Sequence, residues 1–239
     1  MMVYTQTDIG HMRVENQDSS AFVVLEDAVF AVVCDGMGGS NAGSEASNRA
    51  VSIIKERIEK SYRSDYDSNK IRNLLMAAVK TANAVVYDLG STVPEWNGMG
   101  TTCVAALVRN NILHTVNVGD SRAYLITHEI KQITRDHSMV MNMYENGDIT
   151  KEELKSHPKR NVITRAVGVA DDVEPDYFEN ELPANAAVLL CSDGLSNYCD
   201  EGVIFRTVKD LPPEAVPAAL IKNALDNGGS DNITAALIK

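Results

Sequence analysis

The hydrophobic positions along this chain predict strands and helices in an order unlike the alternation of a parallel α/β protein. Apolar runs with strand character cover residues 2–10, 19–27, 28–36, 101–108, 111–119, 121–126, 173–182, 186–192 and 232–238. Apolar residues spaced by three and four predict helices over residues 41–63, 68–89, 200–208 and 213–227. Strands, two helices, many strands, further helices and a last strand favour the α+β class, with antiparallel sheets covered by helices.

Two local features add to this outline. Asn110 and Asn111 separate two apolar runs and predict a tight hairpin turn. Residues 137–160 are polar, contain several methionines and offer few apolar anchors, so we expect an inserted surface lobe there. The sequence has no repeat and no linker rich in Gly, Ser or Pro, so we expect residues 1–239 to form a single domain with this lobe inserted.

Composition narrows the range of partners. The 239 residues are 44% hydrophobic and carry a formal net charge of −11, from 33 acidic and 22 basic residues. This balance disfavours a broad surface for nucleic acid or anionic membrane, although a local arginine can still bind a phosphate. No apolar run approaches the ~20 residues of a membrane helix, and no signal-type segment precedes the first strand, so we expect a cytoplasmic protein.

The four cysteines do not indicate a metal or redox site. Cys34, Cys103, Cys191 and Cys199 lack zinc-type pairing, and the first three lie within apolar runs. We therefore expect them to be small buried hydrophobic residues.

Carboxylates recur where apolar strands begin or end. Asp35 and Asp193 each follow an apolar run, Asp231 opens the last strand, Asp120 lies between two strands and Asp18 precedes another. Any one of these residues is consistent with an ordinary turn. A cluster of them would repel one another, and hard divalent cations relieve such repulsion. Oxygen ligands alone select magnesium, manganese or calcium.

Other catalytic signatures are missing or misplaced. Cys103 and Arg109 have the spacing of the cysteine phosphatases, but the residues between them, VAALV, contain no glycine and predict a buried strand. Such a segment cannot curl its N–H groups around a phosphate. The glycine-rich stretch after Asp35 lacks the Gly-Lys-Ser/Thr of a P-loop, and neither Gly-x-Ser-x-Gly nor His-Glu-x-x-His occurs.

Six motifs place these turns in one order along the chain: Arg13-x-x-Asn-x-Asp18, Asp35-Gly-Met-Gly-Gly39, Gly98-x-Gly-Thr-Thr102, Val118-Gly-Asp-Ser-Arg122, Ser192-Asp-Gly194 and Ser230-Asp-Asn232. The series resembles the metal-dependent protein phosphatases, the type 2C serine/threonine phosphatases, in their compact bacterial form. The resemblance covers essentially the whole chain. It implies two packed antiparallel β-sheets flanked by helix pairs, a four-layer αββα sandwich, with metals in a cleft at one edge.

The resemblance also implies ligands for two tightly bound Mn²⁺ or Mg²⁺ ions. Asp35 would bridge the two ions. Asp193 and Asp231 would complete the shell of one ion, and the carbonyl of Gly36 would bind the other.

Further roles follow from the same resemblance. Arg13 would clamp the substrate phosphate, and Asp18 would hold metal-bound waters, with Asn232 also outside the primary shell. Asp120, together with Asp193, matches the place of a third, weakly bound ion. The lobe at residues 137–160 matches the mobile flap of the bacterial members.

One position departs from part of the family. Eukaryotic relatives carry a histidine after the Asp-Gly, often assigned as the general acid, where this chain has Met37. A metal-bound water is then our candidate for the proton donor. Two ions that share a carboxylate lower the pKa of a bridging water to near neutrality. The expected reaction is direct attack of that hydroxide on phosphoserine or phosphothreonine, without a phosphoenzyme.

Three other functions remain as alternatives. A pseudophosphatase that only binds phosphoproteins would be expected to have lost a metal aspartate, and all are present. A two-metal phosphodiesterase or nuclease fits poorly with the net charge of −11. A calcium-binding structural module would pack its ligands into one loop, whereas here they are dispersed. We expect a monomer whose partners are phosphorylated proteins, including a cognate Ser/Thr protein kinase, and neither nucleic acid nor membrane.

Overall fold

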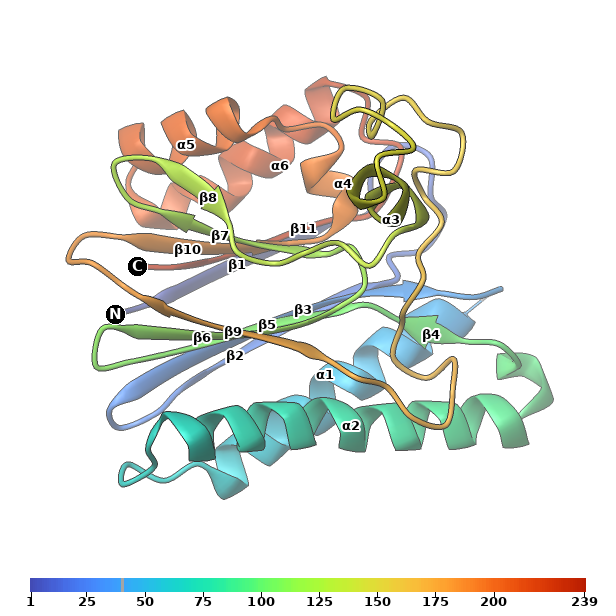
Figure 1. The fold of residues 1–239 in the computed structure, drawn as a ribbon, viewed down its shortest axis with the longest axis horizontal. Helices are drawn as coiled ribbons and strands as arrows, with labels where there is room; N and C mark the ends of the chain where they lie inside the picture. Colours follow the sequence, from blue (N-terminus) through green and yellow to red (C-terminus); the bar gives the residue numbers. More distant parts are fainter. Residues whose placement is uncertain (40) are drawn as a thin grey trace.

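Two antiparallel sheets lie face to face, and a pair of helices covers the outer face of each sheet (Figure 1). This computed structural model describes residues 1–39 and 41–239. The strand orders are β1-β11-β10-β7-β8 in one sheet and β2-β3-β5-β6-β9 in the other. The predicted α+β class and the four-layer αββα sandwich are both confirmed.

The bounds of the elements follow the predicted outline. The first sheet contains β1 (Val3–Asp8), β11 (Ile233–Ile238), β10 (Ala187–Cys191), β7 (Arg122–Ile126) and β8 (Ile130–Gln132). The second contains β2 (Asp18–Val24), β3 (Ala28–Met37), β5 (Cys103–Arg109), β6 (Ile112–Val118) and β9 (Asp176–Glu181), with β4 (Gly100–Thr101) beside β3. The helices are α1 (Ala42–Ser61), α2 (Ser68–Thr92), α3 (Met139–Glu145), α4 (Asp193–Ser196), α5 (Glu201–Asp210) and α6 (Val216–Asp226), with short 3-10 turns η1 (Pro94–Trp96) and η2 (Pro213–Ala215).

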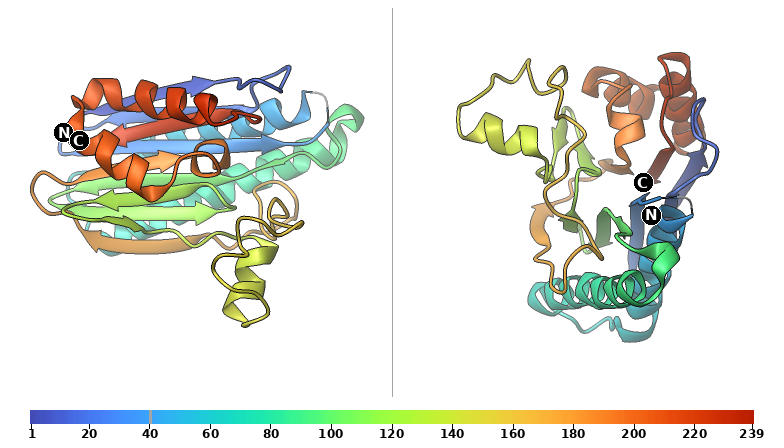
Figure 2. Two further views of the ribbon diagram at one scale, coloured as in Figure 1. Left: turned by 90° about the horizontal axis from the view of Figure 1, so that it is seen from above. Right: turned by 90° about the vertical axis from the view of Figure 1, so that its right-hand side faces the viewer.

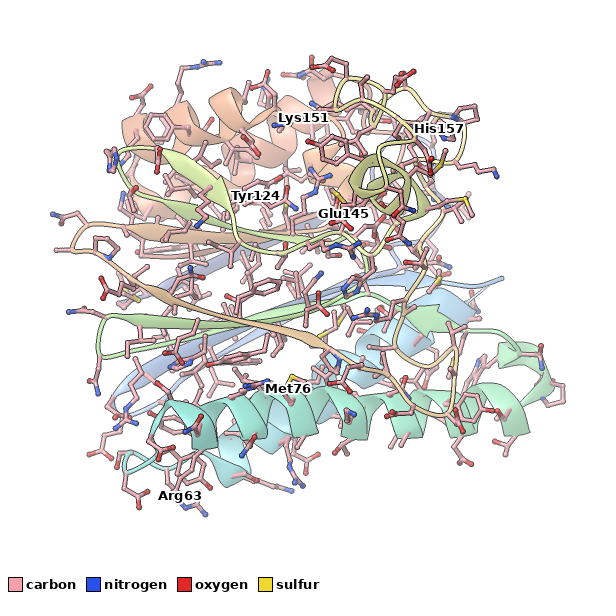
Figure 3. The ribbon with its side chains drawn as sticks, in the orientation of Figure 1. Arg63, Met76, Tyr124, Glu145, Lys151 and His157 are labelled. Atoms are coloured by element: carbon pink, nitrogen blue, oxygen red, sulfur yellow. The ribbon has the colours of Figure 1, made fainter. Side chains whose placement is uncertain are left out.

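The central strands β3, β5 and β10 are largely apolar because both of their faces are buried. Along β3, Phe30 and Val32 pack in the layer beneath α1 and α2, whereas Ala31 and Val33 pack between the sheets. On the other sheet, Leu189 of β10 packs under α5 and α6. Side chains alternate between the two faces of a strand, so a strand buried on both faces is apolar at most of its positions. Figure 3 shows side chains filling the space between the layers.

Several local predictions are confirmed. Asn110 and Asn111 both adopt positive φ, 48° and 61°, as a two-residue hairpin turn requires. All four cysteines are free and buried. Helix α2 begins at Ser68, as predicted, and the side chain of the preceding N-cap residue Asp67 accepts a hydrogen bond from Lys70 N.

Other details differ from the outline. The three-residue β8 was not predicted, because so short a segment shows no period. The last helix begins at Val216, since Pro213 opens the 3-10 turn η2 instead. Asp193 is the first residue of α4 and not part of a simple turn.

The ends of the chain and the acidic turns lie at opposite ends of the sandwich. Met2 N donates to the carbonyl of Lys239 at 2.6 Å, where both termini lie side by side (Figures 1 and 2). The turn that contains Asp120 joins β6 of one sheet to β7 of the other. It therefore crosses between the layers.

Residues 137–160, with α3, project beside the end of the sheets opposite the termini (Figure 2). Glu145, Lys151 and His157 mark this segment in Figure 3. Within the part of the chain that the structure describes, no helix has both the length and the apolar character needed to cross a membrane.

The close approach of α4 to β11 makes a prediction about Gly194. A Cβ atom at this position would lie 2.0 Å from the carbonyl oxygen of Asn232, whereas one at Gly39 would meet nothing within 4 Å. Gly194→Ala should therefore lower the unfolding free energy by about 1–3 kcal/mol, the usual cost of overpacking. Urea denaturation of metal-free protein measures this, with Gly39→Ala as the matched control. Equal stability of the two variants would contradict the prediction.

Candidate metal and phosphate site

The acidic turns meet at one cavity of about 330 Å³. The two sheets end here, so the turns that follow their strands come together. Seven of the eight residues that the sequence singled out line this cavity: Arg13, Asp35, Gly36, Asp120, Asp193, Asp231 and Asn232. The eighth, Asp18, is buried nearby. Met37 also lines the cavity.

Asp35 lies near the end of β3, and its main chain is held on two sides. Its N–H donates to Thr102 Oγ1 at 2.9 Å, and its carbonyl accepts from Thr102 N at 2.8 Å and from Thr101 Oγ1 at 2.9 Å. Thr102 Oγ1 is also 2.7 Å from Ser121 Oγ. The Gly-Thr-Thr motif therefore fixes the backbone that carries Asp35. Burial, followed by repulsion from Asp18, raises the pKa of Asp35 well above its usual range.

Asp18 lies directly opposite Asp35 in the antiparallel pair β2–β3. Its Oδ2 accepts a 2.6 Å hydrogen bond from Ser192 Oγ, while its buried Oδ1 has no hydrogen-bond partner. Burial raises the pKa of Asp18 to about 7, against the opposing effect of the Ser192 hydrogen bond. One oxygen of this carboxylate is thus positioned and the other remains without a donor.

Asp193 opens α4 immediately after β10. Its Oδ2 accepts from Asn197 Nδ2 at 3.1 Å, and its Oδ1 is buried without a donor. Burial and repulsion from Asp231 raise the pKa of Asp193.

Asp231 is engaged by Arg13 in this structure. Arg13 Nη2 donates to Oδ2 at 2.8 Å, and Arg13 Nε lies 2.8 Å from Oδ1, which is a bidentate pair. The Arg13 side chain remains 52% exposed, so solvent and ligands can reach it. Asn232 supports its loop: Nδ2 donates to the carbonyls of Ile9 and Glu15.

Asp120 faces the same cavity from the turn between the sheets. Burial, with repulsion from Asp193 and then Asp136, raises the pKa of Asp120 to about 7. Asp136 is buried and forms a bidentate pair with Arg122, whose Nη2 donates to Oδ2 at 2.6 Å and whose Nε donates to Oδ1 at 3.1 Å.

The carboxylates fit a divalent cation in chemistry. Two buried oxygens lack donors, one on Asp18 and one on Asp193, and burial together with mutual repulsion raises the pKa of four members of the group, as expected where positive charge is needed. Across residues 1–39 and 41–239, no three acidic, His or Cys side chains converge closely enough to enclose one ion. Arg13 contributes to this arrangement, because it engages both oxygens of Asp231.

A second cavity of about 420 Å³ adjoins the first and shares four of its lining residues: Asp120, Asn161, Asp193 and Asp231. It lies between the 137–160 lobe and α4, with Val140, Met141, Leu154 and Tyr198 in its lining. The sequence prediction missed Asn161, for which no motif gave a signal. It also missed Asp136, although Arg122 in the fourth motif could have suggested a buried acidic partner.

Comparison with known proteins agrees with this geometry. The family described as protein phosphatase 2C matches residues 11–223. The serine/threonine phosphatase Stp of Listeria monocytogenes is 34% identical over 237 residues, which cover 98% of this chain and 94% of that protein. PstP of Mycobacterium tuberculosis, a serine/threonine protein phosphatase, is 36% identical over 96% of this chain and 43% of its own length.

A solved structure extends the likeness to the fold. The serine/threonine phosphatase Stp1 from Staphylococcus aureus superposes with a TM-score of 0.93 at 38% identity, covering 99% of this chain and 94% of that one. The family match, the near-complete coverage and the acidic site at the sheet ends agree: this chain belongs to the protein phosphatase 2C family.

Proposed function

We propose that this chain is a divalent-metal-dependent serine/threonine protein phosphatase that acts on phosphorylated proteins. The main support is the cavity where carboxylates gather around the exposed Arg13: burial and mutual repulsion raise the pKa of four of them, and Asp18 and Asp193 each have a buried oxygen without a donor. Membership in the protein phosphatase 2C family supports the same reaction class.

In this proposal the acidic turns hold Mn²⁺ or Mg²⁺, two ions tightly and a third weakly. Asp35, the Gly36 carbonyl, Asp193 and Asp231 would be the ligands of the tight ions, and Asp120 with Asp193 would hold the third. Bound there, the ions would supply positive charge to the phosphoryl oxygens and a water that ionises near neutral pH.

Arg13 has two uses for one guanidinium. Its planar fork matches a carboxylate and a phosphate equally well in geometry. In this structure the fork binds Asp231, and we infer that a substrate phosphate competes for it. Transfer of Arg13 to the phosphate would release both oxygens of Asp231 for a cation.

The leaving oxygen of serine or threonine needs a proton, and Met37 has none to give. Met37 lines the cavity beside Asp35, so no side-chain acid stands at that position. We assign the proton to a water beside Asp120.

The wider setting follows from the same proposal. We propose a single catalytic domain over residues 1–239, with the 137–160 lobe as a flap that influences substrate choice. We also propose a monomeric, cytoplasmic enzyme with phosphoproteins as substrates, a cognate Ser/Thr kinase among them. The likeness to named phosphatases supports the substrate class.

The direct test is release of phosphate from a phosphothreonine peptide with and without Mn²⁺. Asp35→Asn should abolish the Mn²⁺-dependent rate, and it should reduce the rise in unfolding temperature that Mn²⁺ produces, because an ion that binds only the folded state stabilises it. Asp88→Asn, on the exposed side of α2, is the control. If wild type binds Mn²⁺ and the peptide without hydrolysis, the chain is a pseudophosphatase. Near-wild-type turnover of Asp35→Asn would remove Asp35 from the centre of the site.

Arg13→Ala separates phosphate binding from metal binding. Loss of a charge-assisted contact of roughly 1.5–3 kcal/mol should raise KM for the phosphopeptide. Affinity for Mn²⁺, measured by calorimetry, should stay the same or rise, because Asp231 loses its competitor. Arg13→Lys should restore KM only in part, since an ammonium cannot form the fork. A lower kcat at unchanged KM would indicate a role confined to the transition state.

The raised pKa of Asp18 makes a prediction for metal-free protein. The folded chain keeps a proton on Asp18 up to about pH 7, whereas an unfolded aspartate releases it near 3.8. The stability that this proton provides is complete below the lower value and is lost as pH rises through the higher one. Asp18→Asn does not titrate, so in EDTA its unfolding free energy should gain on wild type as pH rises from about 4 to about 7. If urea denaturation gives a difference in unfolding free energy between the two proteins that does not change across this pH range, the raised pKa of Asp18 is contradicted.

A further inference from the structure

His137 lies at the base of the polar lobe, yet its side chain is only 1% exposed. Its main-chain N–H donates to the carbonyl of Gly119 at 2.9 Å, and Gly119 N donates to His137 Nδ1 at 3.1 Å. One residue thus binds both polar groups of Gly119. Gly119 directly precedes Asp120.

The backbone at Gly119 has little freedom to move. Its φ is +103°, and a Cβ there would lie 2.6 Å from Thr102 Cγ2. Asn117 Nδ2 also donates to its carbonyl at 3.1 Å. Thr102 is the residue whose hydroxyl binds Asp35 N. The backbone at Gly119 therefore sits between the support of Asp35 and the ring of His137.

The contacts define the state of the imidazole. Because Nδ1 accepts a hydrogen bond, the ring proton of a neutral His137 lies on Nε2. Nε2 is 3.1 Å from Asp176 Oδ2, a close contact that falls short of good hydrogen-bond alignment. Asp176 is held in turn by Arg165 Nη1, 2.7 Å from Oδ1. Burial lowers the pKa of His137, partly offset by Asp176, which agrees with a neutral ring.

His137 also connects this turn to the segment that carries Asn161. Thr164 N donates to the carbonyl of His137 at 2.7 Å, and Met139 N donates to the carbonyl of Val162 at 2.8 Å. Ser138 and Ile163 form an isolated antiparallel bridge. Asn161 lines both cavities, so this bridge joins the Asp120 turn to a second part of the site.

We propose that His137 is a positioning residue for the hydrolytic reaction: its Nδ1 holds Gly119 and thereby directs Asp120 into the cavity. The contribution of Asp120 to hydrolysis rests on the proposed function, but the hold on Gly119 does not. The carboxylate of Asp176 close to Nε2 favours the ring proton on that nitrogen, so that Nδ1 is free to accept. Residues that orient a ligand in this indirect way typically cost about 10–100-fold in activity when removed.

Two conservative variants separate the two ring nitrogens. In His137→Asn, the amide oxygen can occupy the place of Nδ1 and accept from Gly119 N, while contact with Asp176 is lost. In His137→Gln, the longer side chain can reach Asp176 but leaves Gly119 N without its acceptor. His137→Ala removes both.

The first readout is amide hydrogen exchange of Gly119 in metal-free protein, measured by NMR. We expect His137→Asn to retain protection of this amide, and His137→Gln and His137→Ala to exchange about tenfold faster or more, as for a lost hydrogen bond. In wild type, ¹⁵N shifts of the ring should show a bare Nδ1 and a protonated Nε2. A protonated Nδ1, or equal exchange in the Asn and Gln variants, would overturn the proposal.

The second readout is steady-state hydrolysis of the phosphopeptide. His137→Asn should keep most of kcat, and His137→Gln should lose about tenfold or more in kcat with KM little changed. A merely structural role would lower kcat in proportion to the loss of unfolding free energy, whichever nitrogen is replaced, and would overturn the proposal. If His137→Ala does not fold, the Asn–Gln comparison and the wild-type spectrum decide. If wild type proves inactive, the exchange and tautomer measurements still test the hold on Gly119.

Discussion

The packing of the two sheets holds several carboxylates close together at one end of a rigid β-sandwich. Asp18 and Asp35 are cross-strand neighbours where β2 begins and β3 nears its end, and Asp193 follows a strand buried on both faces. Strands packed on two sides cannot tilt to separate their ends without opening the core. The carboxylates therefore answer their repulsion by retaining protons, by pairing with a cation, or both. Two buried carboxylate oxygens lack a hydrogen-bond donor, and the pKa values of several carboxylates are raised. The other groups of the protein therefore do not fully compensate the negative charge of the cluster.

Arg13 meets part of the demand from within the chain. Its bidentate pair with Asp231 neutralises one carboxylate, and its half-exposed position keeps the guanidinium within reach of solvent. In the proposed mechanism, this arginine would be the counter-ion of Asp231 in one state and would bind the substrate phosphate in another. The proposed exchange would link phosphate binding to cation binding, because each ligand would free the protein group that the other needs.

Most of the fold could be predicted from the sequence, for a physical reason. Strands buried on both faces require long apolar runs in the sequence. When two helical segments separate such runs, few layered arrangements of the chain are possible. The sequence also indicated which acidic residues gather at one end of the sandwich, since they lie where those apolar runs begin or end. It did not reveal the Arg13–Asp231 pair, the Asp136–Arg122 pair or the contacts of His137, because these join segments far apart in the chain through side-chain geometry. The short β8 and α4 were missed because too few residues define a period.

The most direct test of this account is a crystal structure of the protein soaked in Mn²⁺, with the ions located by anomalous scattering at the manganese edge. We expect anomalous peaks against Asp35 and Asp193, with Asp231 turned from Arg13 toward an ion. A site without manganese at concentrations that support hydrolysis, or manganese bound while Arg13 still holds both oxygens of Asp231, would contradict it.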